Sequence, residues 1–348
     1  MTLTTTPLAP ADRDDLAQAR EVHRLIGGAM VSRALYAACR LRIPDLCADQ
    51  PRTAEELGAI AGADPDALGR VLRLLAGEGV FIEDDDGCFH LTARGELLCR
   101  DRVGTQWHLA VLLPELIEPT PEAALFAVRT GGSAFEHAHG CALYPHLAAH
   151  PDAEALFAEA MTARAACLHA QVIEAVDWTG VHHVVDVGGN HGGFLAAILG
   201  HLPAATGLLF DQPQVVAGAA AALDAAGVAD RVDVEGGSFF AAVPPGGDLY
   251  LVANVLWNWD DDGAGRILRR CRDAMAPSAR LLICEPVIPP GNGQHAAKLL
   301  DLGNFWLNGG RTRTLAAWRA LLEGAGFDLV QIAETELEWS VLEARPRS

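Results

Sequence analysis

The chain has 348 residues, enough for two domains with a large apolar core at the usual ~100–200 residues per domain. Half of the residues are hydrophobic and a fifth are charged, which is typical of a globular protein, and no apolar run reaches the ~18–20 residues of a transmembrane helix. The formal net charge is −19 and Lys298 is the single lysine, so we expect no nucleic-acid partner, which would require a basic surface.

The N-terminal stretch MTLTTTPLAPADRDD lacks the basic and apolar regions of a signal peptide. We therefore expect residues 1–15 to be a disordered lead, and the protein to be cytoplasmic. The eight cysteines are scattered and form no C-x-x-C pair, so we expect free, mostly buried thiols, with no disulfide and no metal site.

Residues 16–102 read as helices followed by a hairpin. The stretch EVHRLIGGAMVSRALYAACRL has helical apolar spacing, and later helices begin at the capping box of Thr53 and Glu56 and at Asp64-Pro65. The segment VFIEDDDGCFHLT predicts a β-hairpin that turns at Asp86-Gly87. This order is a winged-helix pattern, but the acidic charge favours a structural or dimerisation role over DNA binding.

Residues 103–176 continue as a helical connector with a Gly/His-rich break at TGGSAFEHAHGCALYPHL. His137 and His139 in that break, with His146 further on, raise the possibility of a metal site. No carboxylate or thiol accompanies them in a ligating pattern, so we expect solvated loop residues instead.

Residues 177–348 alternate strands and helices, which predicts a doubly wound, mostly parallel sheet of Rossmann-like type. The expected strands are HHVVDVG, ATGLLFD, RVDVEGG, DLYLVANVL and ARLLICEPV, and one helix is expected over PQVVAGAAAALDAAG. The tail GFDLVQIAETELEWSVLEARP adds two strands, expected as an antiparallel pair at one edge.

The stretch VVDVGGNHGG carries the strongest ligand signal. A buried strand ends at Asp186, the turn Gly188-Gly189 lets the backbone approach a ligand, and Gly192-Gly193 allow a helix to start nearby. The next strand ends in Asp211, where an acid can hydrogen-bond ribose hydroxyls. A carboxylate at Asp186 would oppose a pyrophosphate, so the pattern favours an adenosine-containing cofactor with a cationic group over a dinucleotide.

With these motifs the chain resembles the S-adenosylmethionine-dependent O-methyltransferases of the plant caffeate type, in their bacterial natural-product-tailoring branch. The motifs that carry the resemblance occur in family order: DVGGNHGG, LLFDQP, GGSFF, VLWNWDD, LLICEPVIP and GGRTRT. The resemblance implies S-adenosyl-L-methionine as cofactor, S-adenosyl-L-homocysteine as product and a small aromatic substrate. It also implies a homodimer, formed through the N-terminal domain, which lines the partner's pocket.

The resemblance also implies which residues form the site. Gly188 would lie near the methionine end of the cofactor, Asp211 on the ribose, and Ser238 and Phe239 beside the adenine. The complete set of expected cofactor residues is Asp186, Gly188, Gly189, Asp211, Gln212, Gly237, Ser238, Phe239, Asn254 and Met161. The expected substrate-pocket residues are Trp107, His108, Phe157, Met161, Trp257, Asn304, Phe305 and Asn308.

The chain departs from the family pattern at the catalytic positions. The family's histidine base is replaced by Trp257, followed by Asn258 in place of an aspartate. Thr312 stands where the family has a supporting acid, Ser238 where it has the adenine-side aspartate, and Ala253 where it has a basic residue. Of the family's histidine and two supporting acids, Glu285 is the one that remains. The catalytic candidates are Trp257, Asn258, Glu285 and Asp301, and the possible substitute bases are Glu285, Asp301, His108 and His295, the last expected to be solvent-exposed.

The sequence favours methyl transfer to a hydroxyl of an aromatic or polyketide acceptor, promoted by proximity and orientation without the histidine base. An alternative keeps the cofactor but performs decarboxylation, hydroxylation or pericyclic ring closure. A second alternative is a winged-helix regulator.

Overall fold

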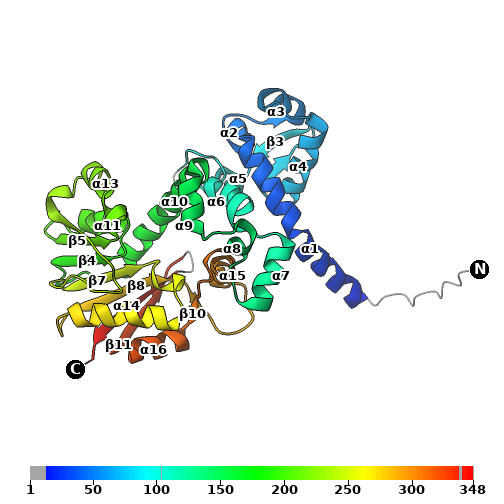
Figure 1. Ribbon diagram of the computed structural model, residues 1–348. Helices are drawn as coiled ribbons and strands as arrows, with labels where there is room; N and C mark the ends of the chain where they lie inside the picture. Colours follow the sequence, from blue (N-terminus) through cyan, green and yellow to red (C-terminus); the bar gives the residue numbers. More distant parts are fainter. Residues whose placement is uncertain (1–12, 103, 337–338, 348) are drawn as a thin grey trace, which may run out of the picture. The chain divides into compact units, whose positions relative to one another are not determined.

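The computed structural model describes residues 13–102, 104–336 and 339–347 (Figure 1). The chain divides into two compact units, Met1–Leu116 (unit 1) and Ile117–Ser348 (unit 2). The boundary falls inside the stretch 103–176 that the sequence assigns to a helical connector, and the finer four-part division stays a prediction.

The prediction of a disordered lead over residues 1–15 was wrong at its end. Helix α1 (Arg13–Arg40) already begins at Arg13, and Asp14 and Asp15 lie in its first turn, where acidic side chains stabilise the helix dipole. The rest of the predicted lead lies outside the described residues.

Unit 1 consists of helices around a small antiparallel sheet of order β1-β3-β2. Its elements are α1, α2 (Ile43–Ala48), β1 (Arg52–Thr53), α3 (Ala54–Ala61), α4 (Pro65–Gly77), β2 (Phe81–Glu83), β3 (Cys88–Leu91), α5 (Ala93–Glu96), α6 (Trp107–Leu112) and the π-helical turn η1 (Leu113–Ile117). This is the predicted winged-helix order.

Local sequence explains these boundaries. The Thr53 hydroxyl and the Glu56 carboxylate form the expected capping box at α3, and the Asp64 side chain caps α4. The hairpin forms as predicted, with Gly87 at φ 77°, and its turn also uses the Asp84 carboxylate, which accepts a hydrogen bond from the Cys88 amide.

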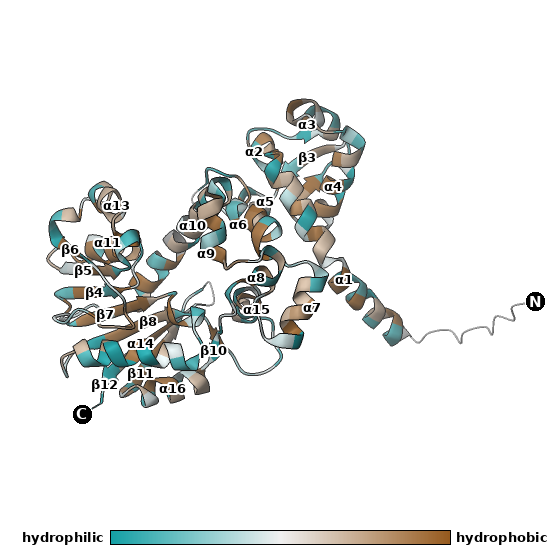
Figure 2. Ribbon diagram, in the orientation of Figure 1, coloured by the Kyte–Doolittle hydropathy of each residue, from teal (hydrophilic) through white to brown (hydrophobic). Residues whose placement is uncertain are grey.

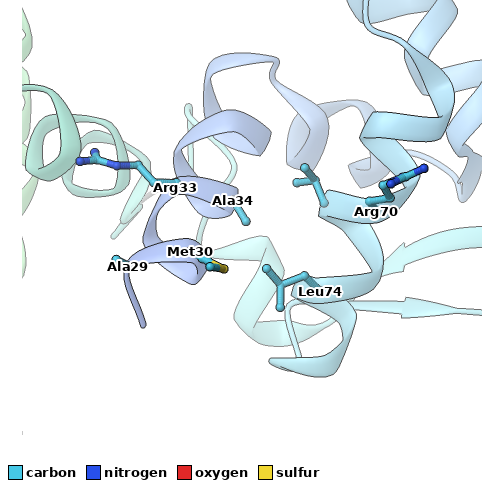
Figure 3. Close-up of a pocket in the computed structure, with 7 residues that line it drawn as sticks. Ala29, Met30, Arg33, Ala34, Arg70 and Leu74 are labelled. Atoms are coloured by element: carbon cyan, nitrogen blue, oxygen red, sulfur yellow. The ribbon is translucent and has the colours of Figure 1, made fainter. Parts of the chain in front are cut away.

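An apolar groove of about 510 Å³ lies between α1 and α4. Figure 3 shows Met30 from α1 beside Leu74 from α4, with the side chains of Arg33 and Arg70 at the margins. Met30 is 71% exposed, and the same helix exposes Leu16, Val22, Leu25 and Ile26. Unit 1 therefore presents a continuous apolar face of the kind that a protein partner covers.

Unit 2 begins with four helices: α7 (Pro121–Thr130), α8 (Ala134–His139), α9 (Leu143–Ala149) and α10 (Pro151–Ala175). The predicted Gly/His-rich loop was wrong, because α8 and α9 occupy it. His137 stacks on Phe126 and His139 on Phe135, with ring centroids 3.8 and 4.2 Å apart. Both histidines are exposed, so the expectation that they are solvated was confirmed, although they lie in a helix and not in a loop.

The centre of unit 2 is a seven-stranded sheet of order β11-β12-β8-β7-β4-β5-β6 (Figure 1). Its strands are β4 (His183–Val187), β5 (Thr206–Asp211), β6 (Val232–Gly236), β7 (Leu249–Ala253), β8 (Arg280–Glu285), β11 (Phe327–Glu334) and β12 (Ser340–Pro346). The strands β4 to β8 are parallel, and β12 and β11 run antiparallel at one edge, as predicted.

The remaining elements of unit 2 connect and cover these strands. They are α11 (Gly193–His201), α12 (Pro213–Val216), α13 (Ala219–Ala225), η2 (Ala229–Arg231), η3 (Leu256–Asn258), α14 (Asp261–Ala274), β9 (Val287–Ile288), α15 (Ala296–Asn308), β10 (Arg313–Thr314) and α16 (Leu315–Gly324). The single helix expected over PQVVAGAAAALDAAG was wrong, since Gly218 separates α12 from α13. Glycine in a helix interior costs about 1 kcal/mol relative to alanine, which favours a break there.

The central strands β4, β7 and β8 are buried on both faces and are accordingly apolar (Figure 2), whereas the edge strand β6 is mostly exposed. Side chains of β7 alternate between two core clusters, with Tyr250 and Val252 on the side of α14 and α16 and Leu249 and Leu251 on the side of α10 and α11. This packing fixes the strand ends, where the predicted site residues lie.

Candidate functional site

The glycine turn after β4 lies at the point where the strand order of the sheet reverses. From β4 the chain proceeds outward to β5 and β6, and it returns on the other side of β4 as β7. Gly188 has φ 77°, and a Cβ there would lie 2.7 Å from Val255, just after β7. Ligands of doubly wound sheets bind in this crevice, so the turn is in the expected place.

Asp186 is a buried carboxylate beneath this turn. It is 2% exposed, its Oδ2 has no hydrogen-bond partner among the described residues, and a Cβ at Gly189 would collide with that oxygen. Burial, and secondarily the charge of Asp211, raise the pKa of Asp186 to about 7. A cationic group placed in the turn would satisfy this carboxylate, which fits the ammonium group of the expected cofactor.

Asp211 ends β5 as predicted, and it orders the backbone around it. Its Oδ2 accepts from the Asn190 amide at 2.9 Å and its Oδ1 from the Gln212 amide at 2.6 Å. Its carbonyl accepts from the Gly237 amide, and a Cβ at Gly237 would lie 2.6 Å from the Phe210 ring. A carboxylate has further lone pairs for ligand hydroxyls, so Asp211 joins three loops in the geometry expected around a ribose.

Aromatic side chains follow Gly237. Ser238 accepts a hydrogen bond from the Phe240 amide, and the Trp259 ring meets the edges or faces of Phe239 and Phe240 at centroid distances of 6.2 and 4.7 Å. The strand-end loops after β6 and β7 therefore share an apolar aromatic cluster, suited to a flat ring.

The loop after β7 holds Trp257 in a defined position. Asn254 adopts φ 58°, and its carbonyl accepts from both the Trp257 indole N–H and the Asn258 amide side chain at 3.2 Å. The Asn304 side chain donates to the Trp257 carbonyl at 2.8 Å, and Asn308 in turn donates to Asn304. The predicted residues Asn254, Asn258, Asn304 and Asn308 thus meet around Trp257.

Glu285 is the residue that anchors this loop. It is 1% exposed, and its Oε1 accepts from the backbone amides of Val255, Leu256 and Trp257 at 3.1, 2.5 and 3.2 Å. Burial raises the pKa of Glu285 to about 7, against the lowering effect of the Arg313 charge. The Oε1 bound to three amides positions the loop, whereas the buried Oε2 has no hydrogen-bond partner among the described residues.

The other candidate bases also have structural partners. Asp301 accepts from the Thr312 amide at 2.8 Å. The prediction of a solvent-exposed His295 was wrong: its side chain caps α15 through the Ala297 amide and pairs with Glu334 at 2.7 Å. His108 belongs to α6 of unit 1, where its ring lies 5.1 Å from that of Trp107.

The remaining predicted pocket residues differ in their surroundings. Trp107 is 5% exposed and donates its indole N–H to the Cys39 carbonyl, so it packs in the core of unit 1. Phe305 packs on the small cluster formed by α7 and α8. Phe157 and Met161 lie half-buried on α10, one helical turn apart.

The sequence reasoning missed Arg164 on the same helix and Trp339 just before β12. The Arg164 guanidinium carbon lies 5.5 Å from the centre of the Trp257 ring and 4.7 Å from that of Trp339. The signal available in the sequence was the helical spacing of Phe157, Met161 and Arg164, which puts the three on one face. Their tryptophan partners are distant in sequence, and only the fold brings them together.

Residues 124–328 match the family of the O-methyltransferase domain, and residues 23–101 match the O-methyltransferase dimerisation domain. The chain is 38% identical to phenazine O-methyltransferase PhzM of Lysobacter antibioticus, over 93% of this chain and 95% of that one. It is 37% identical to 3-amino-4-hydroxybenzoate 4-O-methyltransferase of Streptomyces cremeus, over 94% and 90%. The solved structure of CalO1, a methyltransferase of calicheamicin biosynthesis in its S-adenosylhomocysteine-bound form, superposes with a TM-score of 0.88 at 33% identity, over 97% of this chain and 99% of that one.

Proposed function

Since the chain belongs to the family of S-adenosylmethionine-dependent O-methyltransferases, we propose that it methylates a hydroxyl group on a flat aromatic natural product without a side-chain base. The relatives named above act on a phenazine and on an aminohydroxybenzoate, which supports this acceptor class. The observation that carries the proposal is the contact between the glycine turn of β4 and the loop of Trp257 at the reversal point of the sheet.

The chain's cofactor is S-adenosylmethionine, and we propose the following roles for the residues around the glycine turn. Asp186 pairs with the ammonium group and Gly188 admits the methionine end, because both the unpartnered oxygen and the space at this turn fit that group. Asp211 binds the ribose hydroxyls, and Ser238 and Phe239 flank the adenine.

Bound S-adenosylmethionine supplies an electrophilic methyl group, which leaves its sulfur as a new O–CH₃ bond forms on the acceptor and S-adenosylhomocysteine remains. The residues of this chain orient the acceptor: Trp257 forms an aromatic wall held by Glu285, Asn254 and Asn304. Well-oriented reactants gain roughly 7–11 kcal/mol in ideal cases, more than a general base adds. The hydroxyl proton passes to water.

The alternatives raised by the sequence are not favoured. Each relative named above is a methyltransferase, so decarboxylation, hydroxylation or ring closure on a bound cofactor lacks support. The N-terminal winged-helix unit matches a dimerisation domain, which accounts for it without a regulatory role.

The protein forms a homodimer through its dimerisation domain. We propose that the apolar face of α1 and its groove against α4 lie in that interface, because they expose Leu25, Ile26 and Met30. We also propose a cytoplasmic location. The described cysteines are all free thiols, as a reducing compartment would keep them, and no described helix is long and apolar enough to cross a membrane.

The proposed activity is tested with methyl-labelled S-adenosylmethionine and a panel of hydroxylated naphthalenes and phenazines. We expect one labelled methyl per product, attached to oxygen, with an equal amount of S-adenosylhomocysteine. Label in no acceptor, despite tight S-adenosylhomocysteine binding by calorimetry, would overturn the proposal.

A further inference from the structure

One charged side chain beside Trp257, that of Arg164, makes no hydrogen bond to the described residues that would hold the fold together. Arg164 follows Phe157 and Met161 on one face of α10, and further along that face Leu168 and Val172 are buried in the core. Ala160, one turn before Arg164, is also fully buried, so Arg164 lies between buried positions of the helix, beside the Trp257 loop.

The surroundings of Arg164 offer aromatic faces in place of hydrogen-bond acceptors. The rings of Trp257 and Trp339 stand 5.6 Å apart at 68°, and the guanidinium lies over both. Its Nη2 is inaccessible to water and has no hydrogen-bond partner among the residues that the structure describes. Cation–π contacts attract the charge but leave the N–H donors of Nη2 unsatisfied.

Arg313 of unit 2, which is fully buried while Arg164 is half-buried, shows the contacts of a guanidinium with a structural role. Arg313 bonds the Asp261 carboxylate at 2.8 Å, the Leu256 carbonyl at 3.0 Å and the Trp259 carbonyl at 2.9 Å. It thereby fastens the loop that contains Trp257. Arg164 has no comparable set of oxygen partners among the described residues.

Arg164 nevertheless stays charged. Burial lowers its pKa to about 10, and among the described residues no carboxylate offsets that effect. A cation that is partly withdrawn from water, and that has no ion pair among the described residues, is stabilised when an anion joins it. The missing partner is therefore an anionic oxygen.

We propose that Arg164 binds an anionic oxygen of the aromatic acceptor, either a ring carboxylate or an ionised hydroxyl. This inference rests on the proposed function for the identity of the occupant. The planar fork of a guanidinium binds such oxygens through two parallel hydrogen bonds, while the indoles of Trp257 and Trp339 pack against the ring that carries them. Arg164 would then select acceptors that carry a negative charge and would fix their orientation.

The test measures binding by calorimetry in the presence of S-adenosylhomocysteine. The first two probes are 1-hydroxy-2-naphthoate and 1-naphthol, which share a ring system and differ by one carboxylate. The third is 4-nitrophenol, measured at pH values below and above its pKa, so that it binds either as the neutral phenol or as the phenolate. We expect the wild type to prefer an anionic probe by about tenfold or more, and Arg164→Met to lose that preference while its affinity for 1-naphthol stays unchanged. A preference for the naphthoate assigns the carboxylate, and one for nitrophenolate alone assigns the ionised hydroxyl.

Two further variants control the experiment. Arg164→Lys keeps the charge without the fork and should retain part of the preference. Arg266→Met removes an exposed arginine that also lies over an aromatic ring, Phe240, and should change nothing. Because Arg164 has no hydrogen-bonded structural role, Arg164→Met should keep the melting temperature of the wild type.

The proposal fails if the wild type binds anionic and neutral probes equally or binds neither. It also fails if Arg164→Met retains the preference, or loses affinity for every probe together with a lower melting temperature, which would make Arg164 a packing residue. Labelled methyl transfer to 1-naphthol without any anion preference would remove this inference and leave the proposed function standing. A preference for anionic probes without methyl transfer to any acceptor would support this inference and overturn the proposed function.

Discussion

The two loops that meet at the reversal point of the sheet differ in how tightly their surroundings restrict them. The turn after β4 consists of Gly188 and Gly189 over a buried carboxylate, and a Cβ at either glycine would collide with a neighbouring side chain. The loop after β7 presents Trp257, whose backbone and indole N–H are hydrogen-bonded while its ring contacts Trp339 and Arg164. The frame of this loop depends on its backbone hydrogen bonds. The cofactor end therefore tolerates little variation, whereas the acceptor end can change its chemistry without changing its frame.

The largest effect expected from this comparison is that of Gly188→Val. A Cβ at Gly188 would lie 2.7 Å from Val255, and φ 77° is unfavourable for valine, so the turn must open. We expect S-adenosylhomocysteine affinity to fall roughly 100-fold by calorimetry, with loss of methyl transfer. Gly200→Ala is the matched control, because Gly200 lies in α11 with open space around it, and it should bind like the wild type.

At the acceptor end, we expect Trp257→His to abolish methyl transfer while S-adenosylhomocysteine binding stays within about twofold. The imidazole is smaller than the indole and leaves the contacts to Trp339 and Arg164 unmade. Single-turnover assays at neutral pH would measure this. A steep gain in turnover would instead mean that the absent base limits the reaction.

Substitutions of Glu285 separate a loop anchor from a base. Glu285→Gln retains an oxygen for the three amides and should keep most activity, whereas Glu285→Ala leaves them without an acceptor. We expect the alanine variant to lose at least about 3 kcal/mol in the free energy of unfolding, and to lose turnover with it. Equal loss of turnover in both variants, with the glutamine variant fully stable, would identify Glu285 as a proton acceptor.

The smallest effect is a shift in thermal stability with pH. The pKa of Asp186 rises from its ordinary 3.8 to about 7 on folding, so its protonation stabilises the folded state below 3.8, and that contribution is lost as the pH rises through 7. Without cofactor, Asp186→Asn should melt a few degrees above the wild type near pH 8, and the difference should shrink toward pH 4. Its affinity for S-adenosylhomocysteine should fall, since it lacks the charge that pairs with the ammonium group.

The control for this shift is Asp224→Asn, an exposed acid of α13, which should follow the wild type at every pH. If the melting temperature of Asp186→Asn differed from that of the wild type by the same amount at every pH, Asp186 would not be a buried, proton-binding carboxylate.

The glycine turn after β4 and the acid at the end of β5, where we propose that the cofactor binds, could be predicted from sequence because their pattern is local. A strand, a glycine turn and a helix occur in succession around Asp186, and Asp211 follows at the tip of the next strand. Glu285 could be named but its role could not, because the three amides that it accepts from are in another loop. Arg164 could not be found, because its significance depends on Trp257 and Trp339, which the fold alone brings beside it. The helices α8 and α9 were missed because Gly and His suggest a loop, while the stacking of His137 and His139 on phenylalanines is a tertiary effect.

The exposed apolar face of α1 has a consequence for how much protein a cell must make. In the proposed interface, a second copy would bury Leu25, Ile26 and Met30, which are about 70% exposed in the single chain, so the stability of the helix would rise with chain concentration by mass action. Dilution would then expose these side chains to proteases and to aggregation. The abundance of the folded enzyme would thus respond more than proportionally to the level of its expression.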